Sequence, residues 1–283
     1  MTVLEAIQKS TEFLAKKGVE SPRLQTELLL AHQLKLPRMK LYLNFDRVLT
    51  TPETDGLREL IKRRAAREPL QHILGSTSFC GHEIVVSRAA LIPRPETEML
   101  AELGWKFLVS CHASPVTALD FGTGTGCIAI ALAAKSPHAK ITALDISPEA
   151  LAMAKTNAAQ NKVAERIEFL HGDGFAALQT GPQFDLIVSN PPYIASAEIA
   201  TLEPEVKDFD PRGALDGGAD GLDFYRRLAA EAIPFLKPDG KLMVEFGDGQ
   251  AEDIRKIFEA QKWIVEAVQE DYSHRARILV ARI

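Results

Sequence analysis

Three glycines at alternate positions, in the run Asp120-Phe-Gly-Thr-Gly-Thr-Gly126, constrain the fold of this chain more than any other feature. The run begins at the end of an apolar segment, Val116–Phe121, and leads into a second one, Cys127–Lys135. Glycine permits the positive φ angles of a tight turn and lets a ligand approach the main chain. The pattern therefore predicts a strand, a tight turn and a helix, with a ligand bound at the turn.

Strand and helix patterns alternate from about residue 93 onward. We predict strands at 116–121, 141–145, 167–170, 184–189 and 241–246, and helices at 127–135, 148–161 and about 221–235. A last pair of strands, at 263–268 and 277–281, is close enough in sequence to form an antiparallel edge. This alternation is typical of a doubly wound, Rossmann-like α/β sheet that is mostly parallel, with helices on both faces.

The first 70 residues have apolar residues at helical spacing only, which predicts a small helical bundle. Ser21-Pro22 and Thr51-Pro52 each offer an N-cap followed by proline at the first helical position. Strand-like segments at 76–79 and 83–86, with a turn at 80–82, predict a β-hairpin. We therefore expect three parts: a helical bundle over 1–74, a hairpin linker over 75–92 and an α/β domain over 93–283.

The composition is that of an ordinary globular protein, with 46% hydrophobic and 25% charged residues and a formal net charge of −5. The longest apolar run, residues 127–134, is far shorter than the roughly 20 residues of a membrane span. The three cysteines are widely spaced and the histidines show no paired ligand spacing. We expect a cytoplasmic protein without a membrane partner, a disulfide framework or a metal site.

Charge is unevenly distributed along the chain. Residues 1–75 contain 13 Lys and Arg against 9 Asp and Glu, net +4, and the remainder contains 20 against 29, net −9. An acidic larger part argues against a general nucleic-acid binder, which needs a dense basic surface. The basic N-terminal part suits an acidic protein or an RNA-bearing partner, although scattered solvated charge explains it equally well.

A carboxylate in the second predicted strand suggests which ligand the glycine turn binds. Asp145 ends that strand, 19 residues beyond Gly126, where a carboxylate can accept both hydroxyls of a ribose. The third glycine comes one residue too early for the dinucleotide fingerprint G-x-G-x-x-G. The pattern therefore indicates a nucleoside ligand, and the alternative is a tight turn without a ligand.

Asn190-Pro-Pro-Tyr193 follows the fourth predicted strand, again at the edge of the sheet that binds ligands. An asparagine oxygen and a proline carbonyl form a pair of acceptors that suits an –NH₂ group with two hydrogens to donate. These two acceptors can direct the nitrogen lone pair toward an incoming methyl group and stabilise the positive charge that develops on the nitrogen. Tyr193 can pack over the planar group, and the alternative for the motif is a rigid turn.

Together, the glycine turn, Asp145 and Asn190-Pro-Pro-Tyr193 resemble the class I S-adenosylmethionine-dependent amino methyltransferases. Across nearly its whole length the chain resembles the peptide chain release factor glutamine methyltransferases. The matching stretches are 68–75, 91–98, 190–194, 203–205, 214–222 and 275–277. The stretch Ile92-Pro-Arg-Pro-Glu-Thr-Glu98, together with the N-terminal bundle, is the most specific part of this resemblance.

The resemblance implies roles for individual residues. The cofactor S-adenosyl-L-methionine would be bound by Gly122, Thr123, Gly124, Thr125, Gly126, Asp145, Asp173, Gly174 and Asn190. Some family members have Trp at the position of Gly174, beside the adenine, and Phe175 is the candidate to replace its aromatic surface. Asn190, Pro191 and Tyr193 would be catalytic and, with Pro192, bind the substrate amide. Residues 94–98 would close over the cofactor, or simply form a turn ahead of a helix.

The resemblance also implies the substrate. The enzyme would methylate the glutamine in the Gly-Gly-Gln motif of peptide chain release factors and release S-adenosyl-L-homocysteine. The net charge of +4 in residues 1–75 suggests the further hypothesis that the bundle docks this protein substrate. The rivals are a glutamine methyltransferase acting on a ribosomal protein, an adenine-N6 DNA methyltransferase, and a non-catalytic S-adenosylmethionine-binding module. An adenine methyltransferase should carry a large basic domain, so no direct nucleic-acid substrate is expected.

Overall fold

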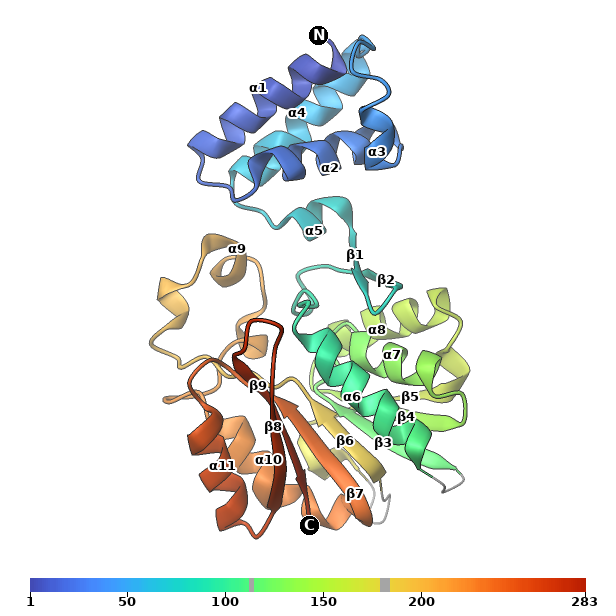
Figure 1. Cartoon of the computed structure of the whole chain (residues 1–283), viewed down its shortest axis with the longest axis vertical. Coiled ribbons are helices and arrows are strands. Elements are labelled where there is room, and N and C mark those ends of the chain that lie inside the picture. Colours follow the sequence, from blue (N-terminus) through green and yellow to red (C-terminus); the bar gives the residue numbers. More distant parts are fainter. Residues whose placement is uncertain (112–114, 179–183) are drawn as a thin grey trace. The chain divides into compact units, whose positions relative to one another are not determined.

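The computed structural model describes residues 1–111, 115–178 and 184–283. The chain divides into two compact units, whose elements are labelled in Figure 1. Unit 1 contains Met1–Ser76 together with Glu203–Phe209, and unit 2 contains Thr77–Leu202 and Asp210–Ile283.

Unit 1 is helical, as the spacing of its apolar residues predicts. Its helices are α1 (Val3–Lys16), α2 (Pro22–Leu34), α3 (Arg38–Leu41), α4 (Thr51–Ala65), α5 (Leu70–Leu74) and the short α9 (Pro204–Lys207). Buried side chains from α1, α2 and α4, among them Leu14, Leu29 and Leu57, pack into one core. α4 ends at Ala65, ahead of Pro69, because proline disfavours helical geometry in the residues before it.

The two predicted N-caps differ from expectation in detail. Ser21 precedes α2, but its φ of +46° is left-handed and its side chain caps nothing, because a capping hydroxyl needs an extended backbone. Thr50, not Thr51, caps α4. A cap at Thr50 places Glu53 at the third helical position, where its carboxylate accepts from the Thr50 N–H in a reciprocal capping box.

The hairpin consists of β1 (Ser76–Phe79) and β2 (His82–Val85), which form a separate two-stranded sheet. The second strand begins at His82, one residue earlier than predicted. Cys80 and Gly81 alone make the turn, both with positive φ, as a two-residue hairpin turn requires.

Unit 2 is built on a seven-stranded sheet, in the order β5-β4-β3-β6-β7-β9-β8. Its strands are β3 (Val116–Phe121), β4 (Ala139–Asp145), β5 (Ile167–His171), β6 (Phe184–Ser189), β7 (Leu236–Glu245), β8 (Ile264–Glu270) and β9 (Ala276–Arg282). β5, β4, β3, β6 and β7 are parallel, while β9 pairs antiparallel with β7 and β8. The predicted fold class, with its antiparallel edge, is therefore confirmed.

Helices cover both faces of this sheet (Figure 1). α6 (Thr97–Ser110), α7 (Cys127–Lys135) and α8 (Pro148–Gln160) contribute to one buried cluster, and α10 (Asp223–Glu231) and α11 (Ala251–Ala260) to another. Neighbouring residues of β3 point to opposite faces, Ala118 into the first cluster and Leu119 into the second. Single 3₁₀ turns occupy Ala164–Arg166, Gly174–Ala177, Ile199–Thr201, Arg212–Ala214 and Ile233–Phe235.

Two predicted elements differ most from the structure in their bounds, while several others differ by one or two residues at an end. The helix expected over 221–235 is α10 followed by a 3₁₀ turn at Ile233–Phe235, because Pro234 cannot continue an α-helix. The strand expected at 241–246 begins earlier, at Leu236, and ends at Glu245.

The order of the strands decides where a ligand can bind. From β3 the chain winds outward through β4 and β5, then returns to the other side of β3 with β6 and continues to β7. β3 and β6 are therefore neighbours at the topological switch point, where α/β sheets bind ligands outside the carboxyl ends of the strands. The glycine turn follows β3 and Asn190 follows β6.

Candidate active site

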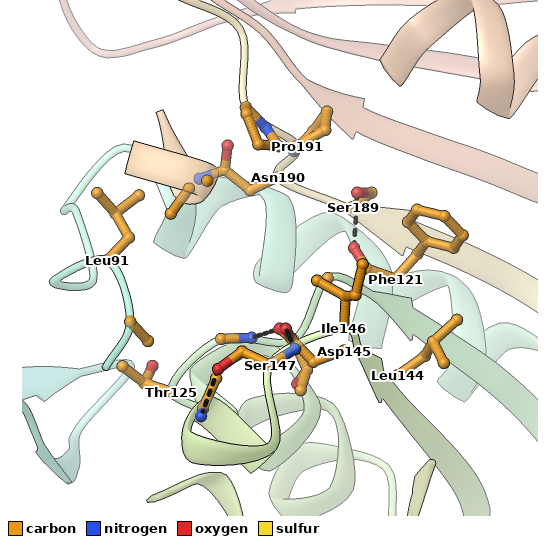
Figure 2. A pocket seen from close by; sticks show the side chains of 18 of the residues that line it. Leu91, Phe121, Thr125, Leu144, Asp145, Ile146, Ser147, Ser189, Asn190 and Pro191 are labelled. Atoms are coloured by element: carbon orange, nitrogen blue, oxygen red, sulfur yellow. Dashed lines mark hydrogen bonds between the residues drawn. The ribbon is translucent and has the colours of Figure 1, made fainter. Parts of the chain in front are cut away.

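A cavity of about 310 Å³ lies at this edge of the sheet. It is lined by residues 122–125, 145–147, 172–174 and 189–192, which lie at or just beyond the carboxyl ends of β3, β4, β5 and β6, and by parts of 89–97 and of α10. Figure 2 shows Asn190 and Pro191 across the cavity from Asp145 and Ser147. The volume is at the lower end of the range for small-molecule sites. The structure thus brings the two sequence motifs to one cavity.

Asp120, which is fully buried, stabilises the glycine turn through hydrogen bonds. Asp120 Oδ2 accepts hydrogen bonds from Thr123 Oγ1 (2.6 Å) and the backbone N–H of Ala129 (3.0 Å). Burial raises the pKa of Asp120 to about 7, although these two donors oppose the shift. The carboxyl therefore fixes the turn to the start of α7.

Asp145 is placed to accept hydroxyl groups from a ligand. Its Oδ2 accepts from the Gly124 N–H (2.7 Å) and its Oδ1 from the Ser147 N–H (2.9 Å). Each carboxylate oxygen has lone pairs to spare after these bonds. Ser147 in turn caps α8, with its hydroxyl accepting from the Ala150 N–H (Figure 2). The carboxylate is thus oriented by backbone donors on both sides.

Gly126 is the one residue of the glycine turn that does not line the cavity. It precedes α7 with φ +81°, and a Cβ there would lie 2.9 Å from the Cβ of Ala154 in α8. Glycine is required at this position because α8 packs directly against the turn. Gly126 therefore supports the site without facing a ligand.

Asp173 and Gly174 line the cavity, but Phe175 does not. The Phe175 ring is buried between Phe121 and Phe235, with centroid distances of 4.8 and 5.1 Å. The expectation that Phe175 supplies aromatic surface to the cavity is therefore wrong, because its ring belongs to the core of unit 2. Phe224, from α10, lines the cavity instead.

The guanidinium of Arg227 occupies the space beside Gly174, and a Cβ on Gly174 would clash with it. Arg227 Nη1 donates to Asp173 Oδ1 (2.5 Å), Nη2 to the Asp173 carbonyl (3.0 Å) and Nε to Glu231 (3.2 Å). Glycine at position 174 thus leaves room for the guanidinium of Arg227, which its hydrogen bonds hold at the wall of the cavity.

Asn190, Pro191 and Pro192 line the cavity, whereas Tyr193 does not. Tyr193 packs against the buried cluster of α10 and α11, and its carbonyl accepts from Gln250 Nε2 (2.9 Å). Burial, with Glu245 nearby, raises the pKa of the Tyr193 phenol. The first three residues of the motif face the ligand site, and the fourth anchors the turn to the core.

Two buried residues beside Asn190 were missed as functional candidates. Thr97, the first residue of α6, accepts a hydrogen bond from Asn190 Nδ2 (3.0 Å). Glu245, the last residue of β7, is buried near the side chains of Thr97 and Asn190, and burial raises its pKa to about 7 although both side chains oppose the shift. The available signal was an acidic residue directly after the apolar run Leu242–Val244, at the edge of the sheet that carries both motifs.

The segment before α6 also reaches the cavity. Pro93, Arg94 and Thr97 line it, and Arg94 Nη2 donates to Asp210 Oδ2 at 2.9 Å. Asp210 is buried, which raises its pKa to about 6 despite the arginine. The resemblance implied that residues 94–98 close over the cofactor, and two of them, Arg94 and Thr97, form part of the wall.

Within the described residues, no cluster of His, Cys, Asp and Glu has the arrangement of a metal site. Over the same residues, no helix combines the length and apolar character needed to cross a bilayer.

Comparisons with known proteins agree with this architecture. Residues 5–75 match the family model described as the PrmC N-terminal domain, and residues 101–203 match the methyltransferase small domain. The crystal structure of a methyltransferase from Pyrococcus furiosus is 20% identical, with a TM-score of 0.52, over 71% of this chain and 89% of that one. The sheet and the methyltransferase domain match are those of a class I methyltransferase, a class that uses S-adenosylmethionine.

Sequence relatives narrow the class to a family. The release factor glutamine methyltransferase of Geobacter sulfurreducens is 47% identical over 91% of this chain and 88% of its own length. The enzyme of the same name from Rhodospirillum rubrum is 46% identical over 94% of this chain and 80% of its own. The chain belongs to the release factor glutamine methyltransferase family.

Proposed function

We propose that this chain transfers a methyl group from S-adenosyl-L-methionine to the side-chain amide nitrogen of a glutamine. The proposed methyl acceptor is the glutamine in the Gly-Gly-Gln motif of peptide chain release factors. Both relatives bear the name release factor glutamine methyltransferase. The observation that carries the proposal is that Asn190 and Pro191 line the same cavity as the glycine turn and Asp145. An acceptor pair for an amide thus faces a site for a nucleoside.

The residues around the cavity fit this cofactor. Gly122 has open space where a Cβ would stand, so bare backbone faces the ligand. Asp145 offers oxygens to the ribose hydroxyls, and Thr123, Gly124 and Thr125 lie alongside. Asp173 and Gly174 border the adenine, with Phe224 and Arg227 completing that wall. Gly126 acts indirectly, by letting α8 pack against the turn.

When bound, the cofactor supplies an electrophilic methyl group on a sulfonium sulfur. The Asn190 side-chain oxygen and the Pro191 carbonyl accept the two hydrogens of the glutamine amide and direct its nitrogen toward that methyl carbon. A C–N bond forms as the C–S bond breaks, and the same acceptors stabilise the positive charge developing on nitrogen. The nitrogen then loses one proton to water. Pro192 completes the pocket, and Tyr193 fixes the turn from the core side.

The helical bundle of unit 1 docks the release factor through its basic surface, in our proposal. Arg64 is unsuitable for testing this role because it is buried, and Arg63 is held by Glu68 through two hydrogen bonds. Lys35 and Lys40 are exposed. Reversing both charges should raise KM for the release factor and leave kcat unchanged, whereas reversing the exposed Lys140 of unit 2 should change neither. An unchanged KM in the double variant contradicts the docking role.

Mass spectrometry of a purified release factor, incubated with this protein and S-adenosyl-L-methionine, tests the activity. A release factor whose motif glutamine is replaced by alanine is the substrate control. One added methyl group on that glutamine, absent from the control, is the expected result. Intact cofactor binding without methylation of any release factor would refute the proposed substrate, and ribosomal proteins and then DNA would be assayed next.

The variant Asn190→Ala separates an enzyme from a non-catalytic binding module. The enzyme should lose turnover by about 100-fold or more, the usual effect of removing a group that stabilises charge in the transition state. Its affinity for the cofactor, measured by isothermal titration calorimetry, should change little. Equal turnover in the variant and the parent chain would remove Asn190 from the mechanism.

A further inference from the structure

A buried carboxyl group, that of Glu245, lies near Asn190. Glu245 is 3% exposed at the end of β7, the strand next to β6. The side chains of Thr97 and Asn190 lie near it and favour its ionised form. Its Oε2 has no hydrogen-bond partner within the described residues. Burying an ionisable group at such a place costs stability, which a role in the site would explain.

Thr97 connects this carboxyl group to Asn190. Its hydroxyl oxygen accepts a hydrogen bond from Asn190 Nδ2 at 3.0 Å. A threonine hydroxyl has one hydrogen to donate, and the nearby Glu245 carboxyl is a suitable acceptor for it. Side chains from the start of α6, the end of β6 and the end of β7 thus form one buried polar group, in which a hydrogen bond joins Asn190 to Thr97.

This polar group distinguishes the two possible orientations of the Asn190 carboxamide. The –NH₂ group donates to Thr97 Oγ1, and Asn190 and Thr97 both favour the ionised form of the nearby Glu245 carboxyl, as hydrogen-bond donors do. In the flipped orientation the Asn190 oxygen would face the carboxylate, and two acceptors would repel each other. The observed orientation leaves Asn190 Oδ1 on the side away from Thr97 and Glu245, as the residue lines the cavity.

We propose that Thr97 and Glu245 are positioning residues that hold the Asn190 carboxamide with its oxygen toward the substrate amide. This inference rests on the proposed function, in which that oxygen accepts an amide hydrogen. Without the pair, the carboxamide rotates between two orientations, and in one of them its –NH₂ group meets the –NH₂ group of the substrate. Removing the pair therefore lowers the fraction of productive complexes, while the cofactor contacts of the glycine turn and Asp145 stay intact.

Nuclear magnetic resonance tests the orientation without any turnover. The chain contains four asparagines, Asn44, Asn157, Asn161 and Asn190, so selective ¹⁵N-asparagine labelling gives four pairs of side-chain signals. Asn190→Ala assigns one pair. Asn157 is a reference, because it is buried and its carboxamide bonds Val85 and Thr125. Thr97→Val should speed hydrogen exchange of the Asn190 –NH₂ group with water, and Thr97→Ser should restore the parent rate.

Kinetics test the consequence for the reaction. Thr97→Val keeps the shape of the side chain but removes its hydroxyl, and should lower kcat about tenfold, the effect of losing one hydrogen bond. KM for the release factor and the Kd of the cofactor should stay within about twofold on the same reasoning. Thr97→Ser should recover most of kcat. Thr156→Val, which removes an exposed hydroxyl bonded to the Ala152 carbonyl, is the matched control and should change nothing.

Thr97→Ala provides a second removal of the hydroxyl if the valine variant unfolds. A kcat that does not fall in a folded variant lacking the hydroxyl overturns the inference, as does an unchanged exchange rate of the Asn190 signals. Equal losses in Thr97→Ser and Thr97→Val would also overturn it, because they would indicate a packing role. If the parent chain methylates no release factor, the proposed function fails, and the exchange measurement still decides the role of Thr97.

Discussion

Replacing Glu205 by alanine should destabilise unit 1 far more than replacing its neighbour Glu203. Glu205 Oε1 accepts hydrogen bonds from Arg64 Nη2 (2.7 Å) and Arg67 Nε (2.6 Å). The exposed fractions of the three side chains are 19% for Glu205, 5% for Arg64 and 23% for Arg67. These bonds attach the segment Glu203–Phe209 to the helices of unit 1.

The expected loss follows from this burial. Removing one partner of a buried ion pair costs about 3–5 kcal/mol, because the other charge stays buried and unpaired. Arg64 keeps two neutral acceptors, Gln25 Oε1 (2.5 Å) and the Glu68 carbonyl (3.1 Å), so we expect the lower end, about 3 kcal/mol. Glu203 also pairs with Arg67, but it is 75% exposed, and its removal should cost less than about 1 kcal/mol.

Urea unfolding followed by two probes measures this difference. Both tryptophans of the chain, Trp105 and Trp263, belong to unit 2, so fluorescence reports on that unit. Far-ultraviolet circular dichroism also follows the helices of unit 1. Glu205→Ala should shift the dichroism transition to lower urea and leave the fluorescence transition almost in place, while Glu203→Ala should shift neither.

The pH dependence provides a second check on the same ion pair. Burial works against ionisation of Glu205, but hydrogen bonds from Arg67 and Arg64 outweigh it, and the net effect lowers the pKa of the carboxyl. A carboxyl with a lowered folded-state pKa stabilises the protein above its unfolded-state pKa and loses that effect as the pH falls. The difference between the parent and Glu205→Ala should therefore shrink in acid. Equal and small losses in the two variants at neutral pH would refute the reasoning.

Three further predictions concern unit 2. Asp145→Asn leaves one acceptor for two backbone donors and should weaken cofactor binding about 10- to 100-fold by calorimetry, and a change below about threefold would contradict the assignment. Gly126→Ala should lower the free energy of unfolding by more than about 2 kcal/mol, because the new Cβ would meet Ala154. Gly122→Ala, which has open space for a Cβ, should lower it by about 1 kcal/mol. Equal losses in the two variants would be inconsistent with this packing. Burial raises the pKa of Glu245 from 4.5 to about 7. The parent should therefore lose about 3 kcal/mol of stability relative to Glu245→Gln as the pH rises through that interval. A difference in stability between the two proteins that stays constant with pH would argue against the raised pKa.

Local patterns in the sequence were sufficient to predict the elements that form the site. The bounds of β3, β6 and α7 agree with prediction to the residue. The glycine turn and Asn190-Pro-Pro followed from chemistry within a few residues, since glycine and proline act on their own backbone. Bounds were less accurate where a distant contact or a cap competes with periodicity, as at Thr50 and in the first half of β7.

What faces the cavity could not be predicted in the same way. Phe175 and Tyr193 stand beside residues that line the cavity, yet both pack against the core of unit 2. A side chain next to a motif residue can point to either side of the backbone, and burial of its apolar surface against the sheet decides which. Packing, not position in the motif, thus determined the direction of these two aromatic rings.

By itself, the sequence determined the fold class, the family and the residues of the two motifs, because these depend on periodicity and on short-range backbone chemistry. Only the tertiary structure brought Thr97 to Asn190, 93 residues away, and Glu245 to both. It likewise brought Glu205 to Arg64, 141 residues away. Such contacts follow from the order of strands in the sheet and from the packing of helices, which depend on the whole chain at once. No local pattern encodes which distant residues will be neighbours.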